Sequence, residues 1–553
     1  MQHVQTSSFN ILLVYPRFLD KSFWNYKATC EATGARYPAA PLGLITLAAL
    51  LPSEWNLRLI NRNTEELTEA DIAWADVVMT GGMLMQQGDT LALIDLVQAR
   101  GKPVAIGGPD ISSSPHVYAK ADFKVIGEAE DVIKDLVAAI RRGERSGTFE
   151  AEKFQVDVTT SPVPRFDLLK LDHYLHIGVQ FSRGCPFTCE FCDIIELYGR
   201  VPRAKTNAQM LAELDALHAC GYRGHVDFVD DNMIGNKKAL KRFLPDLIAW
   251  QKDRGYPFEF STEASVNLAD DNELLGLLRA ANFFAVFVGI ETPDPETLVA
   301  TSKKQNTRRD LTASINKIYA AGMFVTAGFI VGFDGEKDGA GRATTAFIED
   351  AAIAVCMVGL LFALPNTQLT RRLAKEGRLF PGHDVMVDGA GDQCTAGLNF
   401  ETSRPRQDIL RDCQSIISDI YDAKAYFGRV RRVGLLLDCS QHHPPFRPKS
   451  LKEFAGVIWA LSRLRGAAGE FWRTLFHCAF HNPSAVISVI KLSALYLHFG
   501  PFSKVVAGIL EKDIAAPDSR WHGIETTQQH QAGADREAAF AEEADQRLRA
   551  AAG

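Results

Sequence analysis

The sequence has no apolar leader segment and no excess of basic charge. Met1–Asn10 is polar and the apolar run that follows is short, so we expect no secretory signal and a cytoplasmic location. The formal net charge is -7, which gives no reason to expect nucleic acid as a partner. Apolar content of 46% and charged content of 23% are ordinary for a soluble globular chain.

Close cysteine pairs are absent outside a single loop. The seven cysteines beyond that loop are Cys30, Cys220, Cys356, Cys394, Cys413, Cys439 and Cys478. Because they are scattered, they favour ordinary thiols in a reducing cytosol over a disulfide framework.

The other three cysteines, Cys185, Cys189 and Cys192, have the spacing C-x3-C-x2-C after the strand-like run 176–181. This spacing lets three thiolates converge on one face of a cuboidal iron–sulfur cluster and leaves one iron open, whereas four cysteines saturate every iron. Zinc would need a fourth Cys or His at fixed spacing, and none follows within the next twenty residues. A structural zinc knuckle or a chance group of buried cysteines remains the alternative.

With 553 residues the chain is too long for one core, and we expect several domains. In residues 1–150, five apolar runs alternate with helical patterns, which predicts an α/β domain with a doubly wound, flavodoxin-like parallel sheet. Its expected strands are 9–15, 57–60, 77–80, 103–106 and 123–126. Gly82, Gly108 and Glu128 follow the last three of them, where a backbone without Cβ can approach a large flat ligand. The alternative is that these are the turn glycines of any such sheet.

Residues 161–380 repeat the strand–helix alternation six times, which predicts a partial (βα)6 barrel with its site at the carboxyl ends of the strands. The expected strands are 177–181, 226–229, 258–261, 286–289, 325–331 and 357–361. Asp230, Asn232, Glu263 and Glu291 stand at those ends. Polar residues here can also simply begin helices, as Asn236 and Asp294 are placed to do.

Residues 381–515 are expected to form a mainly helical C-terminal domain, and 516–553 a disordered tail rich in Gln, Ala and Glu. The run 485–499 is strongly apolar, but Lys491 interrupts it and it is too short to span a bilayer. With Phe471, Trp472, Arg473, Phe476 and Lys504 it could form a membrane-surface face, or it could pack as an ordinary bundle.

With Phe191 as its aromatic residue, the cysteine loop resembles that of the radical S-adenosylmethionine (SAM) enzymes. The resemblance implies a 4Fe–4S cluster whose open iron binds SAM, and it implies that Glu263 and the turn Asp230–Asn232 contact the SAM ribose and amino group. Glu291 is assigned to cofactor binding with them. The basic run 200–205 could neutralise the SAM carboxylate or the cluster, or it could be a solvated loop.

An α/β domain directly ahead of such a loop resembles the cobalamin-binding class of this superfamily, and Pro41-Leu42-Gly43-Leu44 opening a helix matches its pattern. Gly43, Gly82, Gly108 and Glu128 are therefore assigned to cobalamin. The D-x-H-x-x-G signature is absent, since no histidine lies between His3 and His116, which implies cobalamin without a histidine ligand on its lower face. The aromatic stretch 16–40 could cover the corrin or the substrate, or pack onto its own domain.

The proteins that the chain most resembles include hopanoid C-2 methylases. The resemblance implies methylation of an unactivated carbon by methylcobalamin after a deoxyadenosyl radical removes hydrogen, with no protein general base. Expected partners are a small-molecule or lipid substrate, a flavodoxin or ferredoxin as electron donor, and peripheral contact with the inner face of the membrane. Methylation or oxidative cyclisation of a bacteriochlorophyll-type tetrapyrrole, and a non-catalytic corrinoid or cluster carrier, are the alternatives.

Overall fold

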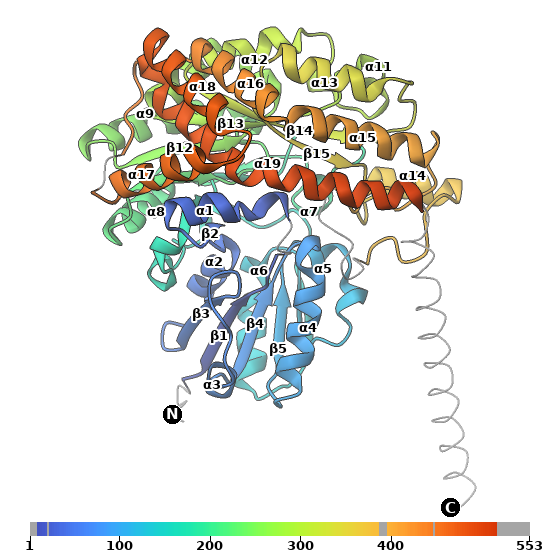
Figure 1. The fold of residues 1–553 in the computed structure, drawn as a ribbon. Coiled ribbons are helices and arrows are strands. Elements are labelled where there is room, and N and C mark those ends of the chain that lie inside the picture. Colours follow the sequence, from blue (N-terminus) through green and yellow to red (C-terminus); the bar gives the residue numbers. More distant parts are fainter. Residues whose placement is uncertain (1–7, 19–21, 386–394, 446–447, 517–553) are drawn as a thin grey trace, which may run out of the picture.

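The fold is built on two parallel β-sheets, which Figure 1 shows one below the other. The computed structural model describes residues 8–18, 22–385, 395–445 and 448–516. The expected disordered tail and Cys394 therefore lie outside the described residues, except for Ala516.

The N-terminal sheet has six strands in the order β3-β1-β4-β5-β6-β7. They are β1 (Asn10–Tyr15), β3 (Asn56–Asn61), β4 (Val77–Gly81), β5 (Val104–Gly107), β6 (Phe123–Ile126) and β7 (Gly147–Glu150). The five expected strands are confirmed within two residues, and β7 is an edge strand that the apolar pattern missed because only alternate residues are shielded. The chain order reverses between β1 and β4, which is the place where such sheets bind ligands.

Helices cover both faces of this sheet, because successive residues of a strand point to opposite sides. Ile11 and Leu13 enter one apolar core with α2 and α6, whereas Leu12 and Val14 enter a second core with helices on the other face. The helices are α2 (Leu42–Leu50), α3 (Glu69–Trp74), α4 (Gln87–Gln98), α5 (Pro109–Ser113) and α6 (Ala129–Arg141). The doubly wound architecture is confirmed.

The second sheet has seven strands, one more than the six expected, in the order β15-β14-β13-β12-β11-β8-β2. They are β2 (Tyr37–Ala39), β8 (Tyr174–Val179), β11 (Gly224–Phe228), β12 (Phe258–Glu263), β13 (Phe283–Glu291), β14 (Phe324–Val331) and β15 (Val355–Leu360). Every pairing is parallel. The extra strand β2 comes from the N-terminal region and is too short to give a periodic signal.

Helices follow the barrel strands, as expected for βα units. They are α7 (Ile194–Leu197), α8 (Asn207–Ala219), α9 (Lys237–Asp253), α10 (Asn272–Ala280), α11 (Pro295–Ala300), α12 (Leu311–Ala320), α13 (Ala340–Asp350) and α14 (Gln368–Glu376). The buried side chains of Val226, Phe228 and Phe260 face these helices, and Phe228 lies 6.2 Å from Phe243 of α9 between ring centroids. The alternate residues Asp227, Ser261 and Glu263 therefore face the inside of the sheet.

The aromatic stretch 16–40 is not a structureless lid. It contains α1 (Lys27–Thr33) and β2, and its aromatic rings pack on the C-terminal helix α19 (Val486–Ala515). The ring centroids of Phe23 and Phe499 are 4.7 Å apart, and those of Tyr26 and His498 are 5.7 Å apart. This segment joins the first domain to the last helices of the chain.

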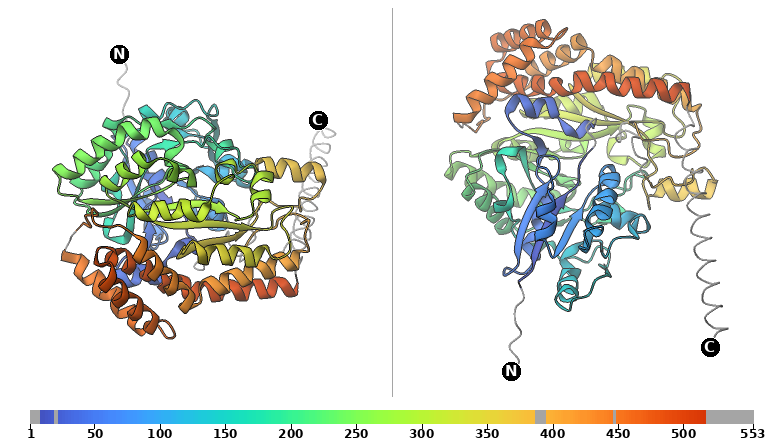
Figure 2. Two further views of the ribbon diagram at one scale, coloured as in Figure 1. Left: turned by 90° about the horizontal axis from the view of Figure 1, so that it is seen from above. Right: turned by 60° about the horizontal axis from the view of Figure 1, so that its bottom comes forward.

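The C-terminal region is helical, as expected, and both views of Figure 2 show its helices along one side of the barrel. Its helices are α15 (Arg406–Ile420), α16 (Ala423–Leu436), α17 (Pro448–Arg463), α18 (Ala468–His481) and α19. One helical stretch, Pro483–Ala515, is long and apolar enough to cross a membrane, but 72% of its most apolar window is buried inside the protein. The expected apolar run thus packs as a core helix, and Lys491 forms an ion pair with the barrel residue Glu259.

Candidate active site

The cysteine loop begins at the carboxyl end of β8, where the strand β9 (Ser182–Arg183) pairs with β10 (Arg203–Ala204). The carboxylate of Asp230, 1% exposed, accepts hydrogen bonds from the backbone N–H groups of Phe181 and Ser182. Asp231 accepts one from the N–H of Gly184 at 2.7 Å. The acidic turn after β11 therefore fixes the start of the loop.

Gly184 is required where it stands. Its φ of +98° is one that L side chains rarely adopt, and a Cβ would meet three backbone carbonyl oxygens at 3.0 to 3.2 Å. Cys185 follows directly and its N–H donates to the carbonyl of Gly199 at 3.2 Å. The conformation of Gly184 and this backbone hydrogen bond thus help to position Cys185.

Two side-chain amides donate hydrogen bonds to the cysteine sulfurs. Asn232 Nδ2 lies 3.8 Å from Cys185 Sγ, and Gln305 Nε2 lies 3.6 Å from Cys189 Sγ. Burial raises the pKa of Cys192, and its neighbours Cys189 and Cys185 raise it further because they are close enough to interact with it. No three His, Cys, Asp or Glu side chains of the described residues converge on one metal ion. Three neighbouring thiols with amide donors are a set that fits a cluster with several irons.

A buried cation also lies beside the cysteines. Lys303 Nζ is 2.5 Å from Glu291 Oε1 and 5.8 Å from the centroid of the Phe191 ring. Burial alone would lower the pKa of Lys303, but Glu291 and the nearby Cys189 outweigh it and raise the pKa. Lys303 and Gln305 were missed by sequence reasoning, because nothing in a single sequence distinguishes the stretch around them from a surface turn.

Glu263 stands at the end of β12 with an exposed side chain. Desolvation by the surrounding protein raises the pKa of Glu263, and the charges of Asp227, Asp231 and Asp230 raise it further, to about 8. A bound cation, such as an ammonium or sulfonium group, would favour the ionised forms of these crowded carboxyl groups at the ends of β11 and β12. Of the residues assigned to SAM, Glu263 is the one that faces solvent, whereas Asp230, Asn232 and Glu291 are buried.

The carboxyl edge of the N-terminal sheet faces the cysteine loop. Glu128, which follows β6, pairs with Arg183 and Arg203, in both cases at 2.9 Å, and Glu130 pairs with Arg183 at 2.7 Å. Contact of Glu128 with cobalamin would require it to give up one of these pairs. These ion pairs instead connect the first domain to Arg183, the residue before Gly184, at the start of the cysteine loop.

The three glycines assigned to cobalamin lie at this edge, and a Cβ on Gly82 would meet the side chain of Gln86 at 3.0 Å. Gly43 opens α2, and a Cβ added there would have no heavy atom within 4 Å. Gly108 has a φ of +101°, and its loop touches the loop of Gly82, since its Cβ would lie 3.5 Å from the backbone of Gly82. The side chain of Met83 next to it is 43% exposed. A flat ligand could rest on this backbone surface.

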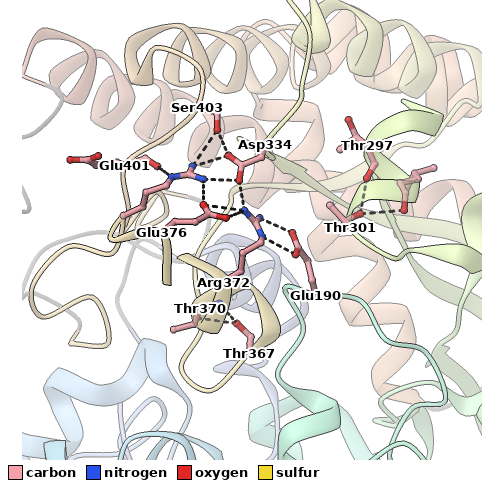
Figure 3. A network of polar contacts seen from close by, with 12 residues as sticks. Glu190, Thr297, Thr301, Asp334, Thr367, Thr370, Arg372, Glu376, Glu401 and Ser403 are labelled. Carbon is pink, nitrogen blue, oxygen red and sulfur yellow. Dashed lines mark hydrogen bonds and ion pairs between the residues drawn. The ribbon is translucent and has the colours of Figure 1, made fainter. Parts of the chain in front are cut away.

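A charged network holds the cysteine loop from the opposite side (Figure 3). Glu190, between the second and third cysteines, pairs with Arg372 of α14 at 3.0 Å, and Arg372 pairs with Asp334 at 2.8 Å. Arg378 also pairs with Asp334 at 2.8 Å. Burial would raise the pKa of Asp334, but its hydrogen bonds with Arg378, Ser403 and Arg372 outweigh it and lower the pKa. These ion pairs thus link the segment after β14, the helix α14 and the cysteine loop.

Comparison with known proteins identifies this arrangement. Residues 179–348 match the radical SAM superfamily. An uncharacterized methyltransferase of Synechocystis sp. is 45% identical over 500 residues, covering 90% of this chain and 92% of that protein. The chain belongs to the radical SAM methyltransferase family. The hopanoid C-2 methylase of Rhodopseudomonas palustris is 40% identical over 68% of this chain and 72% of its own length.

A solved structure supports the fold of the whole enzyme. The radical SAM methyltransferase TsrM from Kitasatospora setae, with cobalamin and a 4Fe–4S cluster bound, has a TM-score of 0.58 and 15% identity over 87% of this chain and all of its own. The family match, the two relatives and this fold together confirm the resemblance to cobalamin-binding radical SAM methyltransferases and hopanoid C-2 methylases. Residues 367–512 match a domain of unknown function, DUF4070, which comprises α14 to most of α19.

Proposed function

We propose that this enzyme is a cobalamin-dependent radical SAM C-methyltransferase that methylates C-2 of a hopanoid lipid. The observation that carries the proposal is the contact between the glycine-lined edge of the first sheet and the cysteine loop, through Glu128 and Arg183. Through this contact, a cradle for a flat cofactor would lie next to a site for a cluster. The 40% identity to a hopanoid C-2 methylase supports the substrate.

Three cysteines and two amide side chains would hold the cluster. Cys185, Cys189 and Cys192 would bind the 4Fe–4S cluster, and Asn232 and Gln305 would stabilise negative charge on its sulfurs. When bound, the cluster with SAM supplies a carbon radical, and cobalamin supplies the methyl group.

The residues assigned to cofactor contact play two different parts. Glu263 would receive the cationic part of SAM, while Glu291 would keep Lys303 in place near the cysteines. Gly43, Gly82 and Gly108 would support the corrin by backbone contact. The chain positions the groups and excludes water, and no general base is assigned.

The electron donor is proposed to be a flavodoxin or ferredoxin that docks beside the cysteine loop. A surface cavity of about 460 Å³ is lined there by residues that include Phe187, Val201 and Lys237. Val201 is 75% exposed, and Arg200 next to it is exposed as well. An acidic redox protein would be attracted by the two cations. An Arg200→Glu variant should be reduced more slowly by flavodoxin but at the same rate by dithionite, and equal slowing by both would contradict this docking site.

The proposed reaction is tested with protein that carries reconstituted cluster and cobalamin, under anaerobic conditions. It is given methyl-deuterated SAM, a reductant and a hopanoid extract that lacks 2-methyl groups, followed by mass spectrometry. We expect a hopanoid with the labelled methyl, together with deoxyadenosine and S-adenosylhomocysteine. Cys192→Ala should abolish all three products, whereas Cys220→Ala, which removes an exposed thiol far from the loop, should not.

The outcomes separate the alternatives. Deoxyadenosine and S-adenosylhomocysteine without labelled hopanoid would refute the substrate but keep the reaction class. Deoxyadenosine without S-adenosylhomocysteine would favour a non-methylating radical reaction, such as ring closure of a tetrapyrrole. Absence of SAM cleavage with every reductant would favour a carrier of cluster or corrinoid.

A further inference from the structure

Exposed apolar side chains are concentrated in one part of the C-terminal region. Of thirteen large apolar side chains that are exposed among the described residues, eight lie in residues 435–487. They are Leu435, Leu436, Leu451, Phe454, Trp459, Phe476, Phe480 and Ile487. Single exposed apolar residues are normal on a protein surface, but a group of this size in so short a stretch indicates a contact surface.

The helices α17 and α18 are apolar on both their inner and outer faces. On α17, Val457 and Leu461 are buried, yet Leu451 and Trp459 are 64% and 60% exposed. A surface helix normally has a polar outer face. Trp459 lies about 160° around the helix axis from both Val457 and Leu461, so it stands on the outward side of α17, and Leu451 is exposed near the start of the helix.

The outer face of α18 is similar. Phe476 and Phe480, four residues apart, are 65% and 85% exposed, whereas Phe471 and Cys478 are fully buried. Trp472 extends this face, because its ring stacks on that of Phe476 at 5.3 Å. Phe476 and Phe480 are thus the two most exposed aromatic side chains among these thirteen.

Basic residues flank the two apolar faces. Residues 448–487 contain five Lys and Arg but only two Glu, in a chain whose formal net charge is -7. The guanidinium of Arg463 lies 4.2 Å from the centroid of the Trp459 ring, and Arg473 is exposed one turn before Phe476. Aromatic and aliphatic side chains bordered by Lys and Arg are the pattern of a surface that binds anionic lipid headgroups.

The more apolar helix α19 is excluded from this role by its contacts. Lys491 pairs with Glu259 inside the barrel, and Thr29 donates to the carbonyl of Ala494 at 3.0 Å. The helix α17 lies outside it, against α1, where a Cβ on Gly456 would clash with the carbonyl of Ala32. Both views of Figure 2 place the α17–α18 pair at the edge of the molecule.

We propose that the outer faces of α17 and α18 bind the surface of an anionic lipid bilayer and bring the enzyme to a membrane-resident substrate. Recruitment to a membrane-resident substrate rests on the proposed function, whereas binding to a bilayer can be measured without any hopanoid. The side chains of Leu451, Trp459, Phe476 and Phe480 would enter the headgroup region, and Arg463 and Arg473 would face the phosphates.

The test uses flotation of the full chain with vesicles of phosphatidylglycerol and phosphatidylcholine that contain no hopanoid. We expect the wild type to float with vesicles, less so with pure phosphatidylcholine or at high salt. Phe476→Ser/Phe480→Ser should lower the partition coefficient by about tenfold or more, because two large rings no longer leave water. Arg463→Gln/Arg473→Gln should weaken binding only to the anionic vesicles.

A matched control is Val299→Ser in α11, which removes a side chain that is 66% exposed on another surface and should leave flotation unchanged. Circular dichroism and iron content verify that each variant is folded. No flotation of the wild type, or equal flotation of the wild type and the double Phe variant, would overturn the proposal. A dimer in sedimentation velocity that the Phe substitutions dissociate, without vesicle binding, would overturn it in favour of self-association. Failure of hopanoid methylation would leave the flotation result intact.

Discussion

The ion pair that joins α19 to the barrel gives a sharp test of how the C-terminal region is held. Glu259, on the inner face of β12, is paired with Lys491 and lies 3.3 Å from His442 Nε2. The ammonium of Lys491 also lies 3.9 Å from the centroid of the Phe284 ring. The substitution Lys491→Met keeps the apolar stem but leaves Glu259 without its main cation.

The expected loss in the free energy of unfolding of Lys491→Met follows from the burial of this ion pair. The side chain of Glu259 is 9% exposed and that of Lys491 is 27% exposed. Removing one partner of a buried pair costs about 3–5 kcal/mol, and partial exposure of Lys491 reduces this to roughly 2–3 kcal/mol. Replacing both partners, as in Glu259→Gln/Lys491→Met, should bring the free energy of unfolding back to within about 1 kcal/mol of the wild type.

The loss of stability caused by Lys491→Met should increase as the pH rises. In the wild type, burial would raise the pKa of Glu259, but Lys491 and His442 outweigh it and lower the pKa. The pair therefore adds stability above the unfolded pKa of about 4.3 and loses it as pH falls. In Lys491→Met, burial dominates and the folded pKa lies above the unfolded value, so the variant loses stability as pH rises. The difference between the two proteins should be smallest below about pH 4, where the carboxyl group of the unfolded chain is protonated, and largest near pH 8.

The assay is urea unfolding of both variants and the wild type, followed by tryptophan fluorescence at several pH values. Lys504→Met, at an exposed position of the same helix, is the matched control and should change stability little. A loss below about 0.5 kcal/mol near pH 8, or a loss that does not vary with pH, would refute the reasoning.

Three further predictions concern the cysteine loop. Gln305→Leu removes the N–H donated to Cys189 Sγ, and should lower the reduction potential of the cluster by on the order of tens of millivolts; an EPR-monitored redox titration with no shift would contradict it. Glu128→Gln weakens the pairs to the loop arginines and should lower the free energy of unfolding by roughly 1–3 kcal/mol, whereas the surface change Glu144→Gln should not; equal effects in urea unfolding would argue against the interdomain role. Arg372→Met frees Glu190 and should speed iron release to a chelator, and a release rate equal to that of the wild type would show that the network does not hold the loop.

Most of the strands could be predicted from the sequence, and the cysteine spacing could be recognised in it, because both are local signals. The strand β6 lies at Phe123–Ile126 as expected, since a short apolar run bounded by turn residues indicates a buried parallel strand wherever it occurs. The spacing of Cys185, Cys189 and Cys192 is likewise contained in eight consecutive residues. Neither feature depends on a distant partner.

The contacts that position the loop are not local. Arg183 meets Glu128 across 55 residues, and Gln305 meets Cys189 across 116 residues. Each is an ordinary polar residue until folding brings its partner close, so periodicity and spacing give no indication of it. The same holds for β2, whose three residues become a strand only when Tyr37 and Ala39 pair with β8.

The long-range contacts of the N-terminal segment bear on the order in which the chain can fold during synthesis. Thr29 bonds to the carbonyl of Ala494, 465 residues later. A ribosome adds about 5–20 residues per second, so α1 and its aromatic neighbours must wait on the order of half a minute or more for the helix that covers them. The first sheet and most of the barrel can form in that interval. The segment that contains α1 stays accessible to chaperones and proteases until translation has almost ended. Release of a chain shortened before α19 should therefore yield a protein whose beginning, and not only its end, is vulnerable to degradation.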